Sequence, residues 1–354
     1  MKSLVLSGGT GTRLRPFTYS LPKQLMPVAG RPVLHHCLHN IRDVGITSVG
    51  MIVGQRNGPV EQALGDGTAL GVRIDYLVQD KPLGLAHCVS VAEDYLDGDD
   101  FLMYLGDNML VGSLADAARD FTRHRPDAKI LVTKVDDPQH YGVAELDAAG
   151  NVVSLAEKPA HPRSDLAMMG VYFFTPAIHE AVRGLRPSAR GELEITDALQ
   201  RLVTGGRQVS AEIYQGFWKD TGSVPGLLEC NRVLLDSIHR DVRGHIDAAC
   251  ELHGPVVVEP GASVIASRLD GPLIVGAGST VRHSRIGPHT SVGRGCLIDN
   301  AHVQESIVLD NVHVEGVWGM RDSVIGRGAR VHGTTSGTHR LLLGDQASVQ
   351  VRTA

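Results

Sequence analysis

The sequence predicts an α/β domain with a mixed, mostly parallel sheet, followed by a left-handed parallel β-helix. Three observations support this fold class. The chain has 354 residues, more than one hydrophobic core usually organises. Its first part alternates short apolar runs with longer helical patterns, as βαβ units do. After about residue 250, units of about six residues recur instead.

The α/β part begins with apolar runs that we interpret as strands. The clearest cover residues 4–6, 49–53, 101–105 and 130–133. Between the first two, residues 32–44 place apolar side chains at helical spacing up to Gly45, which predicts a helix ending there.

The β-helix is predicted from a short repeat of an aliphatic residue, glycine, two variable residues and a small residue. It occurs at residues 275–279, 286–290, 292–296 and 325–329. The aliphatic side chain would point into a narrow prism, while glycine and small residues permit tight corners.

The junction between the two parts carries aliphatic residues over 227–247, which predict a connecting helix. We therefore expect a first domain over residues 1–236, a connecting helix or linker over 237–250, and the β-helix over 251–354.

Bulk composition narrows the function class. Hydrophobic content of 42% and charged content of 21% are ordinary for a globular protein. A net charge of −5 gives no basic footprint for nucleic acid or an anionic membrane, so a small-molecule ligand is expected. The five scattered cysteines show no CxxC spacing, and no segment reads as a signal peptide or membrane span. These features predict a cytoplasmic protein with free thiols.

A glycine-rich turn follows the first strand, with the sequence Gly8-Gly9-Thr10-Gly11-Thr12-Arg13. Consecutive backbone N–H groups in such a turn form an anion-binding nest. It lacks the Gly-Lys-Ser/Thr of a Walker A loop and the third glycine of the dinucleotide fingerprint. Three cations, Arg13, Arg15 and Lys23, follow closely, and a nucleoside triphosphate would neutralise them.

The turn and a series of later motifs together resemble the sugar nucleotidyltransferase family. The later motifs are residues 22–28 (PKQLMPV), 79–87 (QDKPLGLAH), 105–108 (LGDN), 141–143 (YGV), 157–159 (EKP), 191–197 (GELEITD) and 218–222 (WKDTG). Their order and spacing cover residues 1 to about 225. With the β-helix added, the chain is most similar to the long-form members of deoxysugar pathways.

The resemblance implies a Rossmann-like nucleotidyltransferase domain and a specific reaction. A thymidylyl group would pass from dTTP to glucose-1-phosphate, giving dTDP-glucose and pyrophosphate by direct, Mg²⁺-assisted in-line attack. No Ser-His-Asp or Cys-His constellation is needed for such a displacement, in which catalysis is mainly positioning and charge neutralisation.

The resemblance also assigns roles to particular residues. Arg13, Lys23 and Lys158 would be catalytic. The sugar phosphate would be bound by Gly142, Glu157, Lys158 and the backbone at Val171. The nucleotide would be bound by Gly8, Gly9, Gly11, Thr12, Arg13, Lys23, Gln24, Gln79, Gly84 and Asp107.

The metal-binding and base-binding roles also have a physical basis in the residue types and their positions. Asp107 follows an apolar strand, and open α/β sheets bind ligands at the carboxyl ends of their strands. With Asp220 it would bind Mg²⁺, which prefers one or two carboxylates plus phosphate oxygens and water. The amide of Gln79 suits the imide edge of thymine or uracil, and Gly84 lets backbone approach the same base.

Two alternatives stay open at the level of sequence. One is a UTP-dependent uridylyltransferase, including a bifunctional enzyme whose β-helix carries an acetyltransferase with a histidine base. The other is a non-catalytic regulatory subunit. The β-helix is further expected to support a homo-oligomer, because its flat faces and open ends can be covered symmetrically.

Overall fold

The computed structural model describes residues 1–335 and 337–352, and these residues form two compact units. Unit 1 consists of Met1–Gly9 and Leu34–Lys219. Unit 2 consists of Thr10–Val33 and the chain from Asp220 onward. Packing therefore groups the segment after the glycine turn with the C-terminal part of the chain. The domain boundaries expected from sequence, after residue 236 and before residue 251, remain a prediction.

Unit 1 is built on a nine-stranded mixed sheet. Four adjacent strands are parallel, in the order β6-β1-β4-β5, and they contain three of the four runs expected from sequence. Their bounds are β1 Lys2–Leu6, β4 Ser48–Val53, β5 Arg73–Val78 and β6 Phe101–Leu105. Parallel strands covered on both faces are apolar along their length, which is why these runs are recognisable in the sequence.

The other half of the sheet is mainly antiparallel. Its central strand β11 pairs with β6, β8 and β9, while β12 runs parallel to β8. The strands are β8 Ala128–Lys134, β9 Gly142–Leu146, β10 Val152–Glu157, β11 Leu166–Phe174 and β12 Val209–Ile213. A separate two-stranded sheet joins β7 Asn108–Val111 to β13 Phe217–Asp220.

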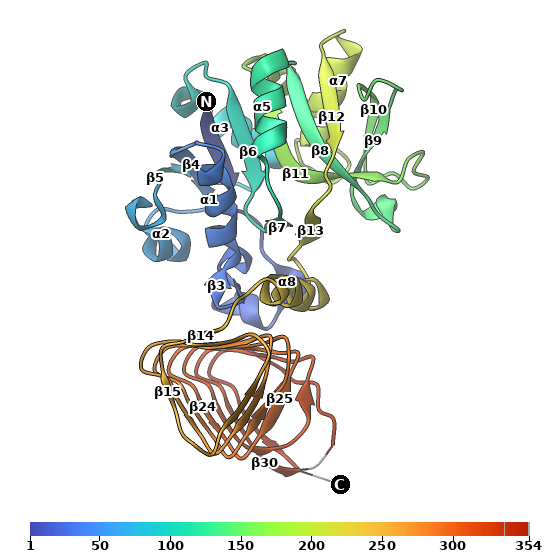
Figure 1. The fold of residues 1–354 in the computed structure, drawn as a ribbon. Helices are drawn as coiled ribbons and strands as arrows, with labels where there is room; N and C mark the ends of the chain where they lie inside the picture. Colours follow the sequence, from blue (N-terminus) through green and yellow to red (C-terminus); the bar gives the residue numbers. More distant parts are fainter. Residues whose placement is uncertain (336, 353–354) are drawn as a thin grey trace. The chain divides into compact units, whose positions relative to one another are not determined.

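Helices cover both faces of this sheet (Figure 1). On one face, Leu4 and Leu6 of β1 belong to a buried cluster with apolar residues of α3, α6 and α7. On the other face, α1 contributes the fully buried Leu34 and Leu38. The helices are α1 Val33–Asp43, α2 Pro59–Leu64, α3 Leu85–Val91, α4 Glu93–Leu96, α5 Ala115–His124, α6 Ala177–Arg183 and α7 Ile195–Thr204. Helix α1 confirms the helix expected before Gly45.

The C-terminal part of unit 2 is a β-helix of three parallel sheets, as predicted, and Figure 1 shows its stacked coils. One sheet contains β14 Asp241–Val242, β17 Val256–Val258, β20 Leu273–Val275, β23 Thr290–Val292, β26 Ile307–Val308, β29 Val324–Ile325 and β31 Leu342–Leu343. A second contains β15 His245–Ile246, β18 Ser263–Ile265, β21 Thr280–Arg282, β24 Leu297–Asp299, β27 His313–Val317, β30 Arg330–Thr335 and β32 Ser348–Val351. The third contains β16 Glu251–His253, β19 Arg268–Asp270, β22 Arg285–Ile286, β25 His302–Gln304 and β28 Met320–Arg321.

The interior of the β-helix is a ladder of aliphatic side chains. Val264, Val281 and Ile298 occupy equivalent positions in successive coils, and all three are fully buried. Outside, residues on neighbouring coils pair with one another. Arg282 donates to Asp299, 17 residues further along the chain, at 2.8 Å, and this hydrogen bond lowers the pKa of Asp299.

The connecting helix is shorter than the sequence pattern indicates. Helix α8 spans Val224–Asp236, and part of the expected linker over 237–250 instead forms β14 and β15. The helix starts at Ser223, whose hydroxyl accepts a hydrogen bond from Gly226 N at 3.3 Å. It gives way to the β-helix because Ile246 can pair in register with Val264 of the next coil. The aliphatic residues after Asp236, such as Val242 and Ile246, therefore belong to the first coil and do not extend the helix.

Three further observations complete the fold. A short hairpin in unit 2 pairs β2 Pro27–Val28 with β3 Arg31–Pro32. The five cysteines are free thiols, as expected. Within the described residues, no helix combines the length and apolar character that crossing a membrane requires.

Candidate active site

The carboxyl ends of the parallel strands bring several predicted residues of unit 1 to one edge of the sheet. Leu6 and Leu105 are register partners in β1 and β6, so Gly8 and Asp107 follow adjacent strands. Gln79 comes directly after β5, and its backbone N–H donates to Val53 O at the end of β4 at 2.9 Å. This edge is where open parallel sheets bind ligands.

Gln79 and Gly84 lie together, as their predicted shared role requires. The Gln79 side-chain amide donates to Gly84 O at 3.2 Å and lies 3.0 Å from Nδ1 of His87. Gly84 has φ 104°, and a Cβ there would lie 2.5 Å from Leu193 O, so only glycine fits. Sequence reasoning did not assign a role to His87, although it ends the same motif.

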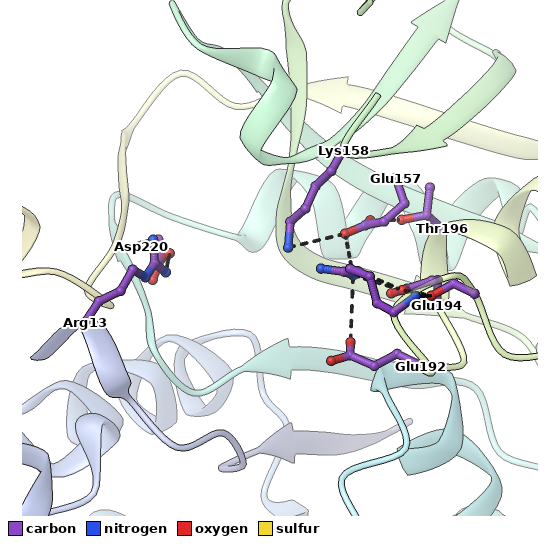
Figure 2. A network of polar contacts seen from close by, with 9 residues as sticks. Arg13, Glu157, Lys158, Glu192, Glu194, Thr196 and Asp220 are labelled. Carbon is purple, nitrogen blue, oxygen red and sulfur yellow. Dashed lines mark hydrogen bonds and ion pairs between the residues drawn. The ribbon is translucent and has the colours of Figure 1, made fainter. Parts of the chain in front are cut away.

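A second group of unit 1 surrounds Glu157 (Figure 2). Gly142 starts β9, and Glu157 ends β10 directly opposite it in register. Thr196, in the first turn of α7, donates its hydroxyl to Glu157 Oε2 at 2.6 Å. A Cβ on Gly142 would lie 3.1 Å from the same oxygen. Gly142 therefore leaves the space in which this carboxylate sits.

Two cations converge on the other oxygen of Glu157. Oε1 lies 3.7 Å from Lys158 Nζ and 3.1 Å from Arg190 Nη2. Lys158 has φ 43°, a conformation that non-glycine residues adopt rarely and that clusters at functional sites. Arg190 was not predicted, although it directly precedes the 191–197 motif.

Glu194 and Glu192 hold Arg190 in place. Arg190 Nη2 lies 2.9 Å from Oε1 of Glu194, whose side chain is only 4% exposed, and 3.7 Å from Glu192. Burial lowers the pKa of Arg190, but the hydrogen bonds and charges of these carboxylates outweigh it, so the pKa is raised. The guanidinium stays charged.

Val171, predicted to contribute its backbone, pairs with Tyr104 of β6. Its side chain is fully buried in β11. The pairing of β11 with β8 shifts register between Met168 and Tyr172, where Gly170 has φ 74°. This irregularity turns backbone groups out of the ladder, and Met169 O accepts the indole N–H of Trp218 at 2.9 Å.

Apart from Gly9, which ends the first segment of unit 1, the remaining predicted residues belong to unit 2. Gly11 has φ 60° and caps a short 3-10 turn, Thr12–Leu14, that carries Thr12 and Arg13 on the surface. Thr18 donates its hydroxyl to Gly11 O at 2.7 Å. A Cβ on Gly11 would lie 2.7 Å from Thr18 Cγ2, so the turn is closed against the following segment.

Arg13 and Asp220 form an ion pair at 3.2 Å (Figure 2). Asp220 Oδ1 also accepts the backbone N–H of Gly222 at 2.8 Å, which fixes the carboxylate. The Arg13 side chain is 71% exposed and so remains accessible to an anion. Lys23 begins the 3-10 turn Lys23–Leu25, while Gln24 beside it is buried, with 1% exposure.

The donor chemistry of the predicted metal ligands fits Mg²⁺. Asp107 and Asp220 offer the hard carboxylate oxygens that this ion prefers. Asp107 is partly buried, and one of its oxygens accepts a hydrogen bond from Asn108 Nδ2 at 3.0 Å. Across residues 1–335 and 337–352, no group of three or more His, Cys, Asp or Glu side chains is arranged to hold a metal ion.

Comparison with known proteins supplies the family. Residues 2–237 match the family described as Nucleotidyl transferase. The chain belongs to the nucleotidyl transferase family. It is 49% identical to a glucose-1-phosphate thymidylyltransferase of Streptomyces griseus over 353 residues, covering 99% of both chains. It is also 49% identical over 355 residues to one of Streptomyces antibioticus, covering 99% of this chain and 100% of the relative.

A solved structure of similar fold comes from Bacillus anthracis, from a protein assigned as a glucose-1-phosphate thymidylyltransferase and in complex with a sucrose. The identity is 34% and the TM-score 0.63, covering 68% of this chain and 97% of that one.

The histidines behind the acetyltransferase alternative are spread over the β-helix and its ends rather than gathered. His283 and His289 have positive φ. His289 lies 2.7 Å from Asp236 and His283 lies 3.6 Å from Asp299. The seven C-terminal histidines of that alternative are His253, His283, His289, His302, His313, His332 and His339.

Proposed function

We propose that the chain transfers a thymidylyl group from dTTP to glucose-1-phosphate, releasing dTDP-glucose and pyrophosphate. The observation that carries this proposal is the similarity to two glucose-1-phosphate thymidylyltransferases over nearly the whole chain. The local chemistry supports it, because an acceptor carboxylate, a lysine and an arginine meet at Glu157. A sugar phosphate offers matching hydroxyl donors and a dianion.

The acceptor half of the reaction falls to the group around Glu157. Glu157 accepts hydrogen bonds from sugar hydroxyls, a role for which Thr196 fixes its orientation. Lys158 and Arg190 hold the sugar phosphate, and Arg190 contributes a planar fork that suits two phosphate oxygens. Their contacts to Glu157 keep both cations in place before substrate arrives.

The nucleotide half falls to the glycine turn, Gln79 and the basic residues. Gln79 reads the base edge, and the backbone N–H groups of the turn donate hydrogen bonds to phosphate oxygens. Arg13 and Lys23 neutralise the triphosphate. Mg²⁺ bound by Asp107 and Asp220 would add charge neutralisation on the triphosphate and the departing pyrophosphate.

The chemical step is a single displacement. An oxygen of the sugar phosphate attacks the α-phosphorus of dTTP and forms a new P–O bond, while the bond from the α-phosphorus to the oxygen bridging to the β-phosphorus breaks. Pyrophosphate leaves with that electron pair. The protein contributes alignment and cationic stabilisation rather than a covalent intermediate.

The test is pyrophosphate release by the purified chain with Mg²⁺. Each of dTTP, UTP, GTP, ATP and CTP is combined with glucose-, galactose- and mannose-1-phosphate. We expect the highest kcat/KM with dTTP and glucose-1-phosphate, with UTP behind it by up to about 100-fold, because one methyl group is worth ~1–3 kcal/mol. No release above blank with any pair would refute the catalytic proposal.

A matched pair of lysine variants ties the activity to the site. Lys158→Ala should raise the KM for glucose-1-phosphate at least about 10-fold, because a charge-assisted contact to phosphate is lost. Lys134→Ala removes an exposed lysine whose only ion pair in the described structure is a 3.7 Å contact with Asp165, and it should leave both KM values unchanged.

We also propose that the chain forms a homo-oligomer through its β-helix. Exposed apolar side chains occur on this part, with Val242 39%, Trp318 40% and Leu342 38% exposed. Burying such side chains in a symmetric interface would stabilise an assembly. Light scattering that gives the mass of one chain at micromolar concentration would reject this proposal.

A further inference from the structure

The segment that carries Arg13 and Lys23 is packed in one unit with the β-helix. Thr10–Val33 belongs to unit 2, although more than 200 residues separate it in sequence from the first coil. Its regular structure is limited to three 3-10 turns of three residues each and the short β2–β3 hairpin. Such a segment needs external contacts to hold one conformation. Apolar side chains such as Phe17 and Met26 are buried, and hydrogen bonds attach the segment to α8 and to the β-helix at two places.

The first attachment is Asn231 of α8, which is completely buried. Its side-chain Oδ1 accepts the backbone N–H of Ala29 at 2.9 Å and the hydroxyl of Ser291 at 2.9 Å. Its Nδ2 donates to His289 O at 2.9 Å. One amide therefore joins the segment, the helix α8 and a coil of the β-helix.

Ala29 shows why this hydrogen bond matters. It has φ 47° in the turn between β2 and β3, a left-handed conformation that disfavours alanine. The hydrogen bond to Asn231 holds it there. The hairpin is coupled to Lys23 through Met26, whose N–H donates to Lys23 O at 3.2 Å and whose carbonyl accepts Val33 N–H at 3.1 Å.

The second attachment is Asp345, near the end of the β-helix. Its Oδ2 accepts the hydroxyl of Ser20 at 2.7 Å, and its Oδ1 accepts the backbone N–H of Arg327 at 2.7 Å. Beside it, a Cβ on Gly344 would lie 3.1 Å from Pro16 Cβ, so coil and segment are in close contact. Pro16 and Ser20 lie on either side of Thr18, whose hydroxyl closes the glycine turn by donating to Gly11 O.

We infer that the β-helix positions the phosphate-binding segment of the active site, and that Asn231 and Asp345 are positioning residues for the nucleoside triphosphate. The inference rests on the proposed function for the identity of the nucleotide. The β-helix then acts on catalysis without touching substrate. Loss of either attachment frees Thr10–Val33 to sample other conformations and weakens dTTP binding, because the ordering entropy must be recovered from the ligand.

The experiment compares Asn231→Ala and Asp345→Ala with the matched control Asp310→Ala. Asp310 accepts the backbone N–H of Arg294 at 2.9 Å, as Asp345 does for Arg327. Within the part of the chain that the structure describes, it has no hydrogen bond to Thr10–Val33. Because Asn231 is buried, Ser20→Ala supplies a surface variant that removes one attachment without disturbing folding.

Two readouts are measured on the full-length protein. The first is the KM for dTTP and for glucose-1-phosphate. We expect Asn231→Ala, Asp345→Ala and Ser20→Ala to raise the KM for dTTP about 3- to 10-fold, as loss of one or two hydrogen bonds implies, with the KM for glucose-1-phosphate within about 2-fold. The second is hydrogen exchange, which should accelerate for amides of residues 10–33 but not for those of β1 and β6.

The outcomes separate this inference from the proposed function. Unchanged dTTP KM and unchanged exchange in all three variants would overturn the inference, as would an equal effect of Asp310→Ala or an equal rise in both KM values. If the wild-type protein turns over no dTTP, the proposed function fails instead. Hydrogen exchange of residues 10–33 then still decides whether the β-helix holds the segment.

Discussion

Replacing Gly84 by alanine tests whether the backbone geometry beside Gln79 is obligatory. Gly84 has φ 104° and ψ 174°, a region that is essentially restricted to glycine and costs other residues about 1–3 kcal/mol. The added Cβ would also lie 2.5 Å from Leu193 O and 2.7 Å from Leu193 N. Backbone atoms of Leu193 would have to move, since no flexible side chain can absorb the overlap.

The expected loss of stability can be worked out from the two backbone hydrogen bonds of Leu193. Its N–H donates to Leu83 O at 2.7 Å, and its carbonyl accepts Ala86 N–H at 3.0 Å. Losing both hydrogen bonds costs about 0.5–1.5 kcal/mol each. Together with the backbone strain, the free energy of unfolding should fall by roughly 2–6 kcal/mol.

The assay is urea unfolding followed by the fluorescence of Trp218. The chain has two tryptophans, and Trp318 belongs to the β-helix, so a Trp318→Phe background makes the signal report unit 1. Gly54→Ala is the control, because its Cβ would meet nothing within 4 Å, and it should stay within about 0.5 kcal/mol of the parent. If Gly84→Ala unfolds at the same midpoint and with the same slope as Gly54→Ala, the steric reasoning is refuted.

Three further predictions concern the site and the β-helix. Glu157→Gln should raise the KM for glucose-1-phosphate about 10- to 100-fold and leave the KM for dTTP nearly unchanged, because a charged hydrogen-bond acceptor is lost. Glu180→Gln, at a side chain 81% exposed, serves as its control in the same assay. Asp299→Asn should lower the melting temperature at pH 7, because Arg282 holds the pKa of Asp299 below its ordinary value. The stabilisation is present above the unfolded-state pKa and is lost as the pH falls through the folded-state pKa, so wild type and variant should converge in acid. Chelation with EDTA should abolish pyrophosphate release and added Mg²⁺ should restore it, whereas activity that persists in EDTA would contradict the proposed use of the metal.

Much of the fold could be predicted because its signals are local. The buried parallel strands β1 and β6 contain continuous apolar runs, and the β-helix repeats one short pattern. The helix predicted over residues 227–247 overlaps α8, but the prediction continued past Asp236, where α8 ends. The reason is that the aliphatic residues of the first β-helix coil continue the helical pattern. The pairing of that coil with the next depends on residues distant in sequence, which a local pattern does not report.

The candidate site was predictable where a motif carried it and not where tertiary packing did. Glu157 and Lys158 were found through resemblance, whereas Arg190 emerged only from its position between three carboxylates. Asn231 has no motif at all. Its importance comes from lying fully buried between three segments, and burial of a polar side chain is not visible in a sequence.

The stacking of coils has a practical consequence for anyone shortening this protein. Each coil is stabilised by its immediate neighbours, and among the described residues the last coil packs against one coil rather than two, so it should open most readily. Asp345 sits in that coil, between β31 and β32. A C-terminal truncation that removes this coil would therefore break the hydrogen bond between Asp345 and Ser20, near the N-terminus. It would do so before it affected the middle of the β-helix.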